Sequence, residues 1–168
     1  LETRQQMNNN VYVTNLMEDA TTDNQVIGIK LRLANGLPFD SWQMDAGWSV
    51  LFGGNWWSSV GNWTPDPERF GESLKGISDV AHEYGIETVL WYEPERIANY
   101  TDWKEEFMDK GWLIYSEAQS CIDLANDEVL DYLCNFIKNS LEINGVDWYR
   151  QDCNFDLLPY WKIRDAET

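Results

Sequence analysis

Hydrophobic residues recur along the chain with two spacings, which predict alternating helices and strands. Apolar positions three and four residues apart predict helices at 22–35, 72–84, 102–110 and 126–145. Shorter apolar runs predict strands at 38–45, 86–91 and 146–149, with an extended insertion at 121–124. Glycines follow three of the helices, as is typical of helix ends. Residues 1–20 are polar, and an apolar alternation at 11–13 could form a first strand and loop.

The predicted order of elements indicates an α/β fold. Helices alternating with strands are typical of a parallel sheet covered by helices. Each long predicted strand is followed by a carboxylate, Asp45, Glu93 or Asp152. The carboxyl ends of parallel strands carry the active site both in β/α barrels and in open sheets, so position alone leaves both folds open. No glycine-rich phosphate motif follows any of these strands.

The last predicted strand carries the residues around which the chemistry is organised. Side chains alternate along a strand, so Trp148, Arg150, Asp152 and Asn154 are expected on one face. The neighbouring guanidinium favours the ionised form of the Asp152 carboxyl. An anion there suits a positively charged reaction centre, and a buried structural ion pair is the equally weighted alternative.

The chain is unusually aromatic, with ten Trp, eight Tyr and six Phe. Four of the Trp residues lie in a long loop, residues 46–67, which we interpret as one wall of a binding site. Aromatic rings interspersed with carboxylates and amides suit sugars, which have apolar ring faces and hydroxyl rims.

Charge and residue usage exclude several classes of function. A formal net charge of −17 without clustered Lys or Arg argues against binding nucleic acid or an anionic membrane surface. No apolar run reaches the roughly 18 residues of a membrane span. His82 is the sole histidine and is expected to be structural or exposed, which excludes Ser-His and Cys-His nucleophiles. The three cysteines, Cys121, Cys134 and Cys153, suggest neither a disulfide framework nor a zinc site.

No cofactor and no metal is expected. The cellular compartment stays open: the start looks truncated, and a cytoplasmic location is slightly favoured because there is no signal-peptide pattern and the cysteine count is odd.

Four motifs together resemble glycoside hydrolase family 36, the α-galactosidase or melibiase clan. They are residues 44–48 (MDAGW), 61–63 (GNW), 91–95 (WYEPE) and 149–154 (YRQDCN). The resemblance extends over residues 20–160 and implies hydrolysis of terminal α-galactosides with retention, on a barrel of eight β/α units. A full barrel needs about 250 residues. We therefore expect residues 21–168 to form a partial catalytic barrel of three to four β/α units.

The resemblance also implies roles for individual residues. Asp152 matches the nucleophile, and Arg150 stands where the family has a Lys that contacts sugar hydroxyls. Asp45 matches the first of two Asp residues that hold the 4- and 6-hydroxyls. Trp91 matches a Trp of the sugar pocket, and Asn154 is expected near the 2-hydroxyl.

Further expectations concern the remaining site residues. Trp63 and Trp91 are expected to be sugar platforms rather than core, and both count as substrate-binding residues. Glu93 and Glu95 are expected to be pocket framework, since strand-end carboxylates often serve ion pairs.

Three departures from the family pattern limit what the resemblance implies about the substrate and the activity. Ala46 replaces the second Asp, which removes one hydroxyl contact and leaves the sugar uncertain. Arg150 has a planar guanidinium group with several N–H donors, which a Lys lacks. The family's acid/base Asp belongs to a later strand, so the 168 residues alone are expected to be at most feebly active. A half-barrel also leaves sheet edges uncovered, so we expect the 168 residues to self-associate through these edges.

Alternatives remain at this point. The enzyme could act on α-N-acetylgalactosaminides, or the chain could be a non-catalytic carbohydrate-binding half-barrel. A metal-dependent barrel enzyme is disfavoured because no His lies near the carboxylates.

Overall fold

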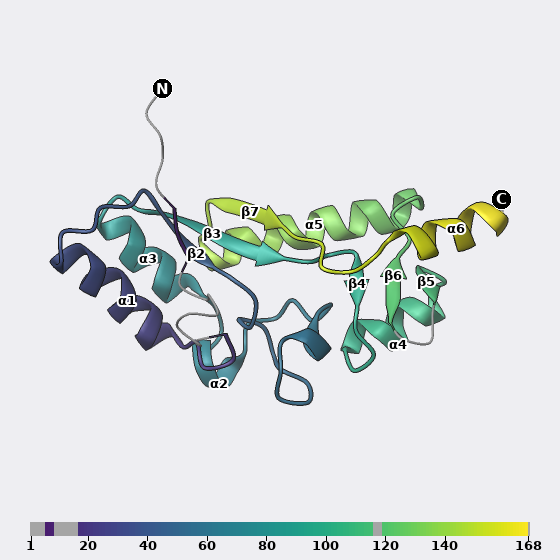
Figure 1. The fold of residues 1–168 in the computed structure, drawn as a ribbon, viewed down its shortest axis with the longest axis horizontal. Coiled ribbons are helices and arrows are strands. Elements are labelled where there is room, and N and C mark those ends of the chain that lie inside the picture. The colour runs from purple at the N-terminus through teal and green to yellow at the C-terminus, as the bar shows by residue number, and fades with distance from the viewer. Residues whose placement is uncertain (1–5, 9–16, 116–118, 168) are drawn as a thin grey trace, which may run out of the picture.

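The central feature of the fold is a four-stranded parallel sheet (Figure 1). The computed structural model describes residues 6–8, 17–115 and 119–167, so the candidate strand at 11–13 lies outside the described residues. The spatial order is β1-β2-β3-β7, and each neighbouring pair is parallel. The strands are β1 (Gln6–Asn8), β2 (Ser41–Met44), β3 (Glu87–Tyr92) and β7 (Trp148–Gln151). The predicted parallel α/β arrangement is confirmed.

Helices connect the parallel strands close to the predicted positions. The three crossover helices are α1 (Thr22–Ala34), α3 (Lys75–Glu83) and α5 (Asp127–Asn144). Local signals set their ends: the Asn126 side chain accepts the Glu128 N–H at the start of α5, and Gly145 ends it at φ 63°. The other helices are a 3₁₀ turn, η1 (Trp57–Ser59), and the helices α2 (Pro67–Phe70), α4 (Asp102–Asp109) and α6 (Leu158–Glu167).

A small antiparallel sheet lies beyond the carboxyl end of β3. Its order is β4-β6-β5, and its strands are β4 (Arg96–Ile97), β6 (Ser120–Ile122) and β5 (Leu113–Tyr115). β6 falls on the extended insertion predicted near 121–124. α6 packs against this sheet, and the Arg164 guanidinium pairs with Asp123 at 3.1 Å. The chain after β7 is thereby tied to the insertion after β3.

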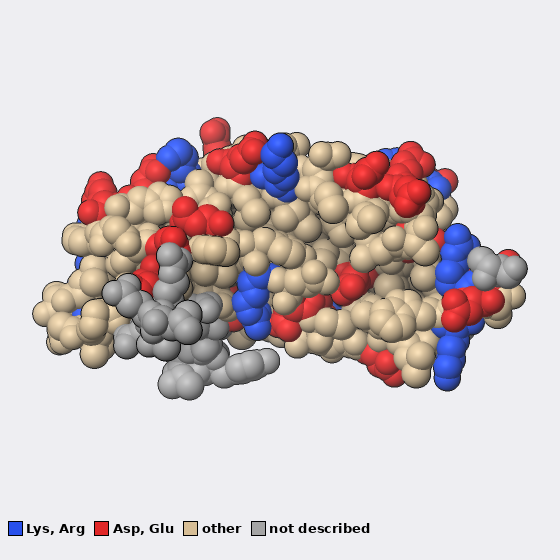
Figure 2. Space-filling model, turned by 90° about the horizontal axis from the view of Figure 1, so that it is seen from above, with Lys and Arg blue, Asp and Glu red and all other residues tan. Residues whose placement is uncertain are grey.

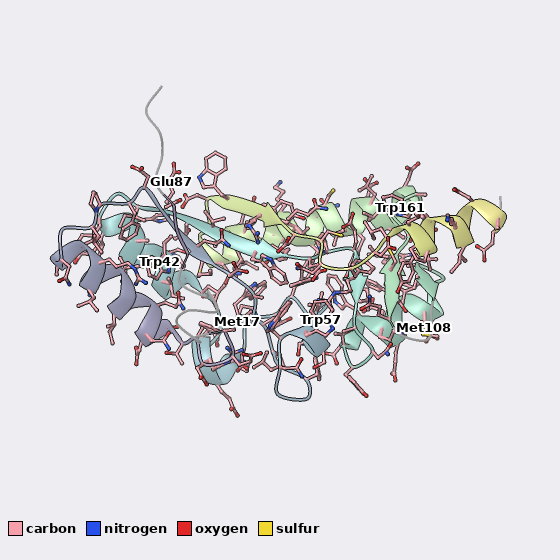
Figure 3. All side chains as sticks on the ribbon, in the orientation of Figure 1. Met17, Trp42, Trp57, Glu87, Met108 and Trp161 are labelled. Carbon is pink, nitrogen blue, oxygen red and sulfur yellow. The ribbon has the colours of Figure 1, made fainter. Side chains whose placement is uncertain are left out.

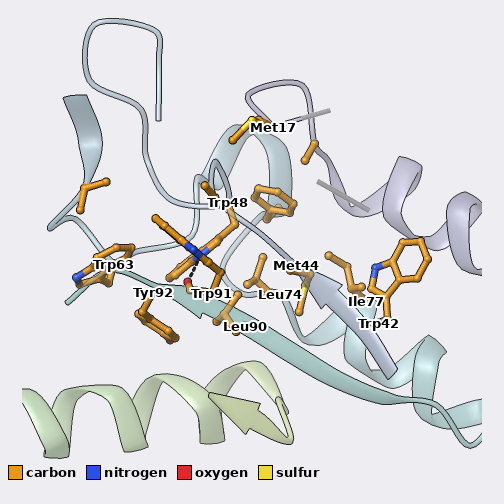
Figure 4. Close-up of a cluster of buried hydrophobic side chains, with 14 of the residues drawn as sticks. Met17, Trp42, Met44, Trp48, Trp63, Leu74, Ile77, Leu90, Trp91 and Tyr92 are labelled. Carbon is orange, nitrogen blue, oxygen red and sulfur yellow. Dashed lines mark hydrogen bonds between the residues drawn. The ribbon is translucent and has the colours of Figure 1, made fainter. Parts of the chain in front are cut away.

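Aromatic side chains dominate the core around the carboxyl ends of β2 and β3 (Figure 4). The Trp48 ring lies 6.0 Å from that of Trp63 and 5.4 Å from that of Tyr92. The Trp48 Nε1–H donates to the backbone oxygen of Trp91 at 2.8 Å. Trp48 is 1% exposed, so its polar edge finds this partner in the interior, as a buried indole N–H requires.

The last strand differs from its prediction in position and burial. It runs two residues later than expected, and Trp148 and Tyr149 are 51% and 36% exposed. The cause is the sheet order, because β7 pairs with β3 alone within the described sheet. Leu130, an apolar residue of α5, is likewise 41% exposed. It borders a hollow of about 730 Å³ between α5 and β7.

Charge is spread over the surface. Acidic side chains are scattered over the face seen in Figure 2 and do not gather in one patch. Cys121, Cys134 and Cys153 are free thiols. No helix in the described ranges is long and apolar enough to cross a membrane.

Candidate active site

Three carboxylates lie at one edge of the parallel sheet. Asp45 directly follows β2, Glu93 follows β3 and Asp152 follows β7. These strands are adjacent, with Met44 paired to Leu90 and Tyr92 paired to Gln151. Their carboxyl ends therefore meet at the edge where β/α folds bind their ligands.

Asp152 is held by several donors and stays partly open to solvent. The Trp91 Nε1–H donates to its Oδ2 at 2.8 Å, and the Arg150 Nη1 lies 3.3 Å from the same oxygen. The Cys153 N–H donates to its Oδ1 at 3.0 Å. The side chain is 30% exposed. The predicted common face of Arg150 and Asp152 is confirmed.

The pKa of Asp152 lies below its ordinary value. Burial acts in the opposite direction and raises it, but hydrogen bonds from Trp91, Cys153 and Asn154 outweigh burial. The charge of Arg150 contributes less than these hydrogen bonds. The sequence predicted an anion stabilised by Arg150; the structure has the anion, and its largest stabilising contact is the Trp91 indole.

Asp45 is partly exposed and oriented by its own strand. The Gln43 amide donates to its Oδ2 at 2.7 Å, and the Ala46 N–H donates to its Oδ1 at 2.8 Å. Ala46, in the position of the family's second Asp, is 2% exposed. Gln43, which the sequence did not single out, is a positioning contact for Asp45.

Trp63 and Trp91 were expected to be platforms rather than core, and this prediction is wrong. They are 3% and 2% exposed and pack in the aromatic cluster, with ring centroids 5.8 Å apart (Figure 4). Neither ring has an open face on which a sugar could stack. The neighbouring rings of Trp48, Trp56 and Tyr92 occupy that space, which the motifs alone do not reveal. Trp91 reaches the site through its Nε1–H, which binds Asp152.

Glu93 is completely buried and forms an ion pair. Its Oε2 accepts from the Arg96 Nη2 at 2.7 Å, and its Oε1 accepts the Asn154 N–H at 2.6 Å. Arg96 is also 0% exposed. Glu93 therefore connects the turn after β3 to the turn that carries Asp152. The spacing of Glu93 and Arg96, three residues apart in the WYEPER run, was the signal that could have indicated this pair.

Glu95 and Asn154 lie at the margin of the site. Burial raises the pKa of Glu95, a hydrogen bond from Gln151 opposes this rise, and the nearby Glu93 adds to it. Asn154 is exposed, and its side chain hydrogen-bonds Asp152. Within the described ranges, no three His, Cys, Asp or Glu side chains gather as metal ligands.

Relatives of this chain are α-galactosidases. Alpha-galactosidase 2 of Pediococcus pentosaceus is 29% identical over 118 residues, which cover 66% of this chain and 16% of that protein. Alpha-galactosidase Mel36A of Lactobacillus acidophilus is 28% identical over 108 residues, covering 60% of this chain and 14% of that protein. The chain thus spans about a sixth of the length of these relatives.

Solved structures show the same fold. The α-galactosidase from Lactobacillus brevis superimposes with a TM-score of 0.74 at 22% identity, over 90% of this chain and 20% of that one. The α-galactosidase AgaA from Geobacillus stearothermophilus in complex with raffinose gives a TM-score of 0.73 at 20% identity, over 90% of this chain and 21% of that one. These similarities confirm the predicted partial β/α barrel. The family model described as Melibiase matches residues 18–164, and the chain belongs to this family.

Proposed function

We propose that this chain supplies the nucleophile and part of the sugar site of a retaining α-galactosidase. The observation that carries the proposal is the Asp152 carboxylate, partly exposed at the carboxyl edge of the sheet with its pKa held down by hydrogen bonds. The relatives are named α-galactosidases, and one related enzyme was solved with raffinose. A carboxylate that stays ionised can attack an electrophilic carbon, whereas a protonated one cannot.

In the first step a carboxylate oxygen of Asp152 forms a bond to C1 of the galactosyl unit. The bond between C1 and the glycosidic oxygen breaks, and that oxygen takes a proton from a second carboxyl group. Water then attacks C1 of the ester and gives a proton to the same group, while the bond between C1 and the Asp152 oxygen breaks. Galactose leaves with the original configuration, and Asp152 is again a carboxylate. We place the second carboxyl outside these 168 residues, because the relatives are several times longer.

The remaining residues bind and orient the sugar in this proposal. Hydrogen bonds from Gln43 and from the Ala46 N–H orient the partly exposed carboxylate of Asp45. In this orientation Asp45 accepts hydrogen bonds from the 4- or 6-hydroxyl of the sugar. Arg150 and Asn154 lie beside Asp152, where they can donate to the 2-hydroxyl and to the charge that develops on the nucleophile. Ala46 offers no hydroxyl contact from its methyl group.

Chemical rescue of an Asp152→Gly variant of the whole protein tests the proposal. Hydrolysis of p-nitrophenyl α-D-galactopyranoside is expected to fall by about 10³-fold or more. Added azide is expected to restore release of nitrophenol and to give β-galactosyl azide, because azide then occupies the place of the carboxylate and attacks the same face. Asp156→Gly, an exposed loop aspartate four residues later, is the control.

Four results would contradict the proposal in whole or in part. Asp152→Gly with wild-type turnover would exclude a nucleophilic role. An azide product of α configuration would assign Asp152 to proton transfer instead. Faster hydrolysis of the N-acetylgalactosaminide than of the galactoside by the wild type would reassign the sugar, and sugar binding with no turnover at all would indicate a binding protein.

A further inference from the structure

Trp57 is an exposed indole that is supported from behind by a buried cation. The residue is 44% exposed, and the Arg96 guanidinium carbon lies 3.8 Å from the centroid of its ring. A cation at this distance covers one face of the ring and is attracted to it. Trp57 lies below the carboxyl ends of the strands in Figure 3. Arg96 therefore holds the ring of Trp57 in place from one side, and the rest of the ring surface is open to solvent.

Arg96 fixes the backbone of Trp57 as well as its ring. The Arg96 Nη1 donates to the Trp57 carbonyl oxygen at 2.9 Å, while Nη2 binds Glu93 at 2.7 Å. Arg96 is 0% exposed, so its charge is balanced inside the protein by Glu93 and is not screened by water. A side chain held in this way loses little conformational freedom when a ligand stacks on it.

The loop around Trp57 is closed by short-range and long-range hydrogen bonds. The Ser59 hydroxyl donates to the Asn55 carbonyl oxygen at 2.8 Å, and the Phe52 N–H donates to the Ser59 hydroxyl at 2.6 Å. The Ala98 N–H donates to the Val60 carbonyl oxygen at 2.8 Å, which ties the loop to the segment that carries Arg96. These bonds hold η1 in place before any ligand arrives.

Trp57 is connected to the nucleophile by two edge-to-face ring contacts. Its ring centroid lies 5.3 Å from that of Trp56, and the Trp56 centroid lies 5.8 Å from that of Trp91. Trp91 binds Asp152 through its Nε1–H. Trp57 is therefore two ring contacts away from the side chain that binds Asp152.

We propose that Trp57 is a carbohydrate-stacking platform for a pyranose unit of the substrate other than the galactosyl unit that is cleaved. Sugar rings present apolar C–H faces that pack on aromatic rings, and their hydroxyl rims stay in water. The proposal deepens the proposed function, because it names the part of the substrate that lies beyond the scissile bond. Trp63 and Trp91, which are buried, cannot take this role.

Binding titrations separate this proposal from the proposed reaction. Raffinose and galactose are titrated calorimetrically into the whole protein carrying Asp152→Asn, so that nothing is turned over. Trp57→Ala in this background is expected to weaken raffinose binding about 5- to 10-fold. Galactose binding is expected to stay unchanged. Trp57→Phe, which keeps a ring over Arg96, is expected to retain most of the raffinose affinity.

Trp161→Ala is the matched control. Trp161 is 53% exposed on α6, far from Trp57 in Figure 3, and its replacement should leave raffinose binding unchanged. Unchanged raffinose affinity in Trp57→Ala, or an equal loss for raffinose and galactose, would overturn the platform. Trp57-dependent raffinose binding by a wild type that hydrolyses nothing would refute the proposed reaction and keep the platform.

Discussion

Two side-chain pairs at opposite ends of the parallel strands have nearly the same length and very different surroundings. Glu93 and Arg96 are 2.7 Å apart just after β3, with side chains 0% and 1% exposed. Asp147 and His82 are 2.8 Å apart just before β7, with side chains 35% and 41% exposed. Water screens the second pair and not the first, so the distance between the two groups does not by itself indicate how much each pair contributes to the free energy of unfolding.

The same comparison applies to the two carboxylates that flank β7. The pKa values of Asp147 and Asp152 are both lowered, and in both cases hydrogen bonds outweigh burial. Asp147 is bound by the Thr88 N–H at 2.7 Å and by His82, so its partners are parts of the scaffold. His82 therefore proves to be both half-exposed and structural. A lowered carboxylate pKa marks a candidate nucleophile only where the edge of the sheet is the binding edge.

The largest effect is expected from breaking the buried pair. Glu93→Gln leaves the Arg96 charge without a counterion and should lower the free energy of unfolding by about 3–5 kcal/mol. Urea denaturation of the whole protein measures this change. Adding Arg96→Met to Glu93→Gln should recover much of the loss, because the uncompensated charge is then gone. A loss below about 1 kcal/mol for Glu93→Gln would show that water reaches the pair.

A smaller effect is expected from the Trp91 indole, which binds Asp152, the proposed nucleophile. Trp91→Phe removes one hydrogen bond to ionised Asp152 and should raise the pKa of this carboxyl. In the proposed reaction Asp152 must be ionised to attack, so the acid limb of kcat/KM should move to higher pH. Trp63→Phe is the control: it removes an indole from the same cluster, and its Nε1 has no partner among the described residues. Equal shifts in both variants would assign the effect to packing.

The smallest effect is expected at the exposed pair. Asp147→Asn should lower the free energy of unfolding by about 0.5 kcal/mol at neutral pH, as for screened surface pairs. The folded-state pKa is below the ordinary 3.8, so the contribution is present above that value and is lost as pH falls through the folded-state pKa. Denaturation of wild type and variant at several pH values tests this. Turnover at pH 7 should match the wild type, and a large loss of turnover would place chemistry at this edge as well.

Local signals in the sequence were sufficient to predict the main helices and strands and the positions of their ends. Asn126 and Gly145 bound α5 because capping depends on a few neighbouring residues. Asp45, Glu93 and Asp152 were assigned to strand ends because an apolar run followed by a carboxylate is also a local pattern. The four motifs identified the family, which the match over residues 18–164 confirms.

Properties that depend on neighbours distant in sequence could not be predicted. Trp63 and Trp91 are buried because Trp48, Trp56 and Tyr92 cover them, and an indole in a motif does not reveal which face is covered. Of the antiparallel sheet only β6 was anticipated, as the extended insertion at 121–124, because its strands have two or three residues each, too few to show a period. Arg96 directly follows the motif at 91–95, but its burial depends on the loop that carries Trp57.

The Asp152 N–H donates to the Tyr92 carbonyl oxygen at 2.8 Å, one residue past the end of β7. The backbone that bears the carboxylate is thus anchored to β3, whose strand is paired on both sides. Among the described residues β7 pairs with β3 alone, so β3 fixes the position of this backbone. Mutations that displace β3 should therefore shift the Asp152 carboxylate more than mutations in α6, which follows β7.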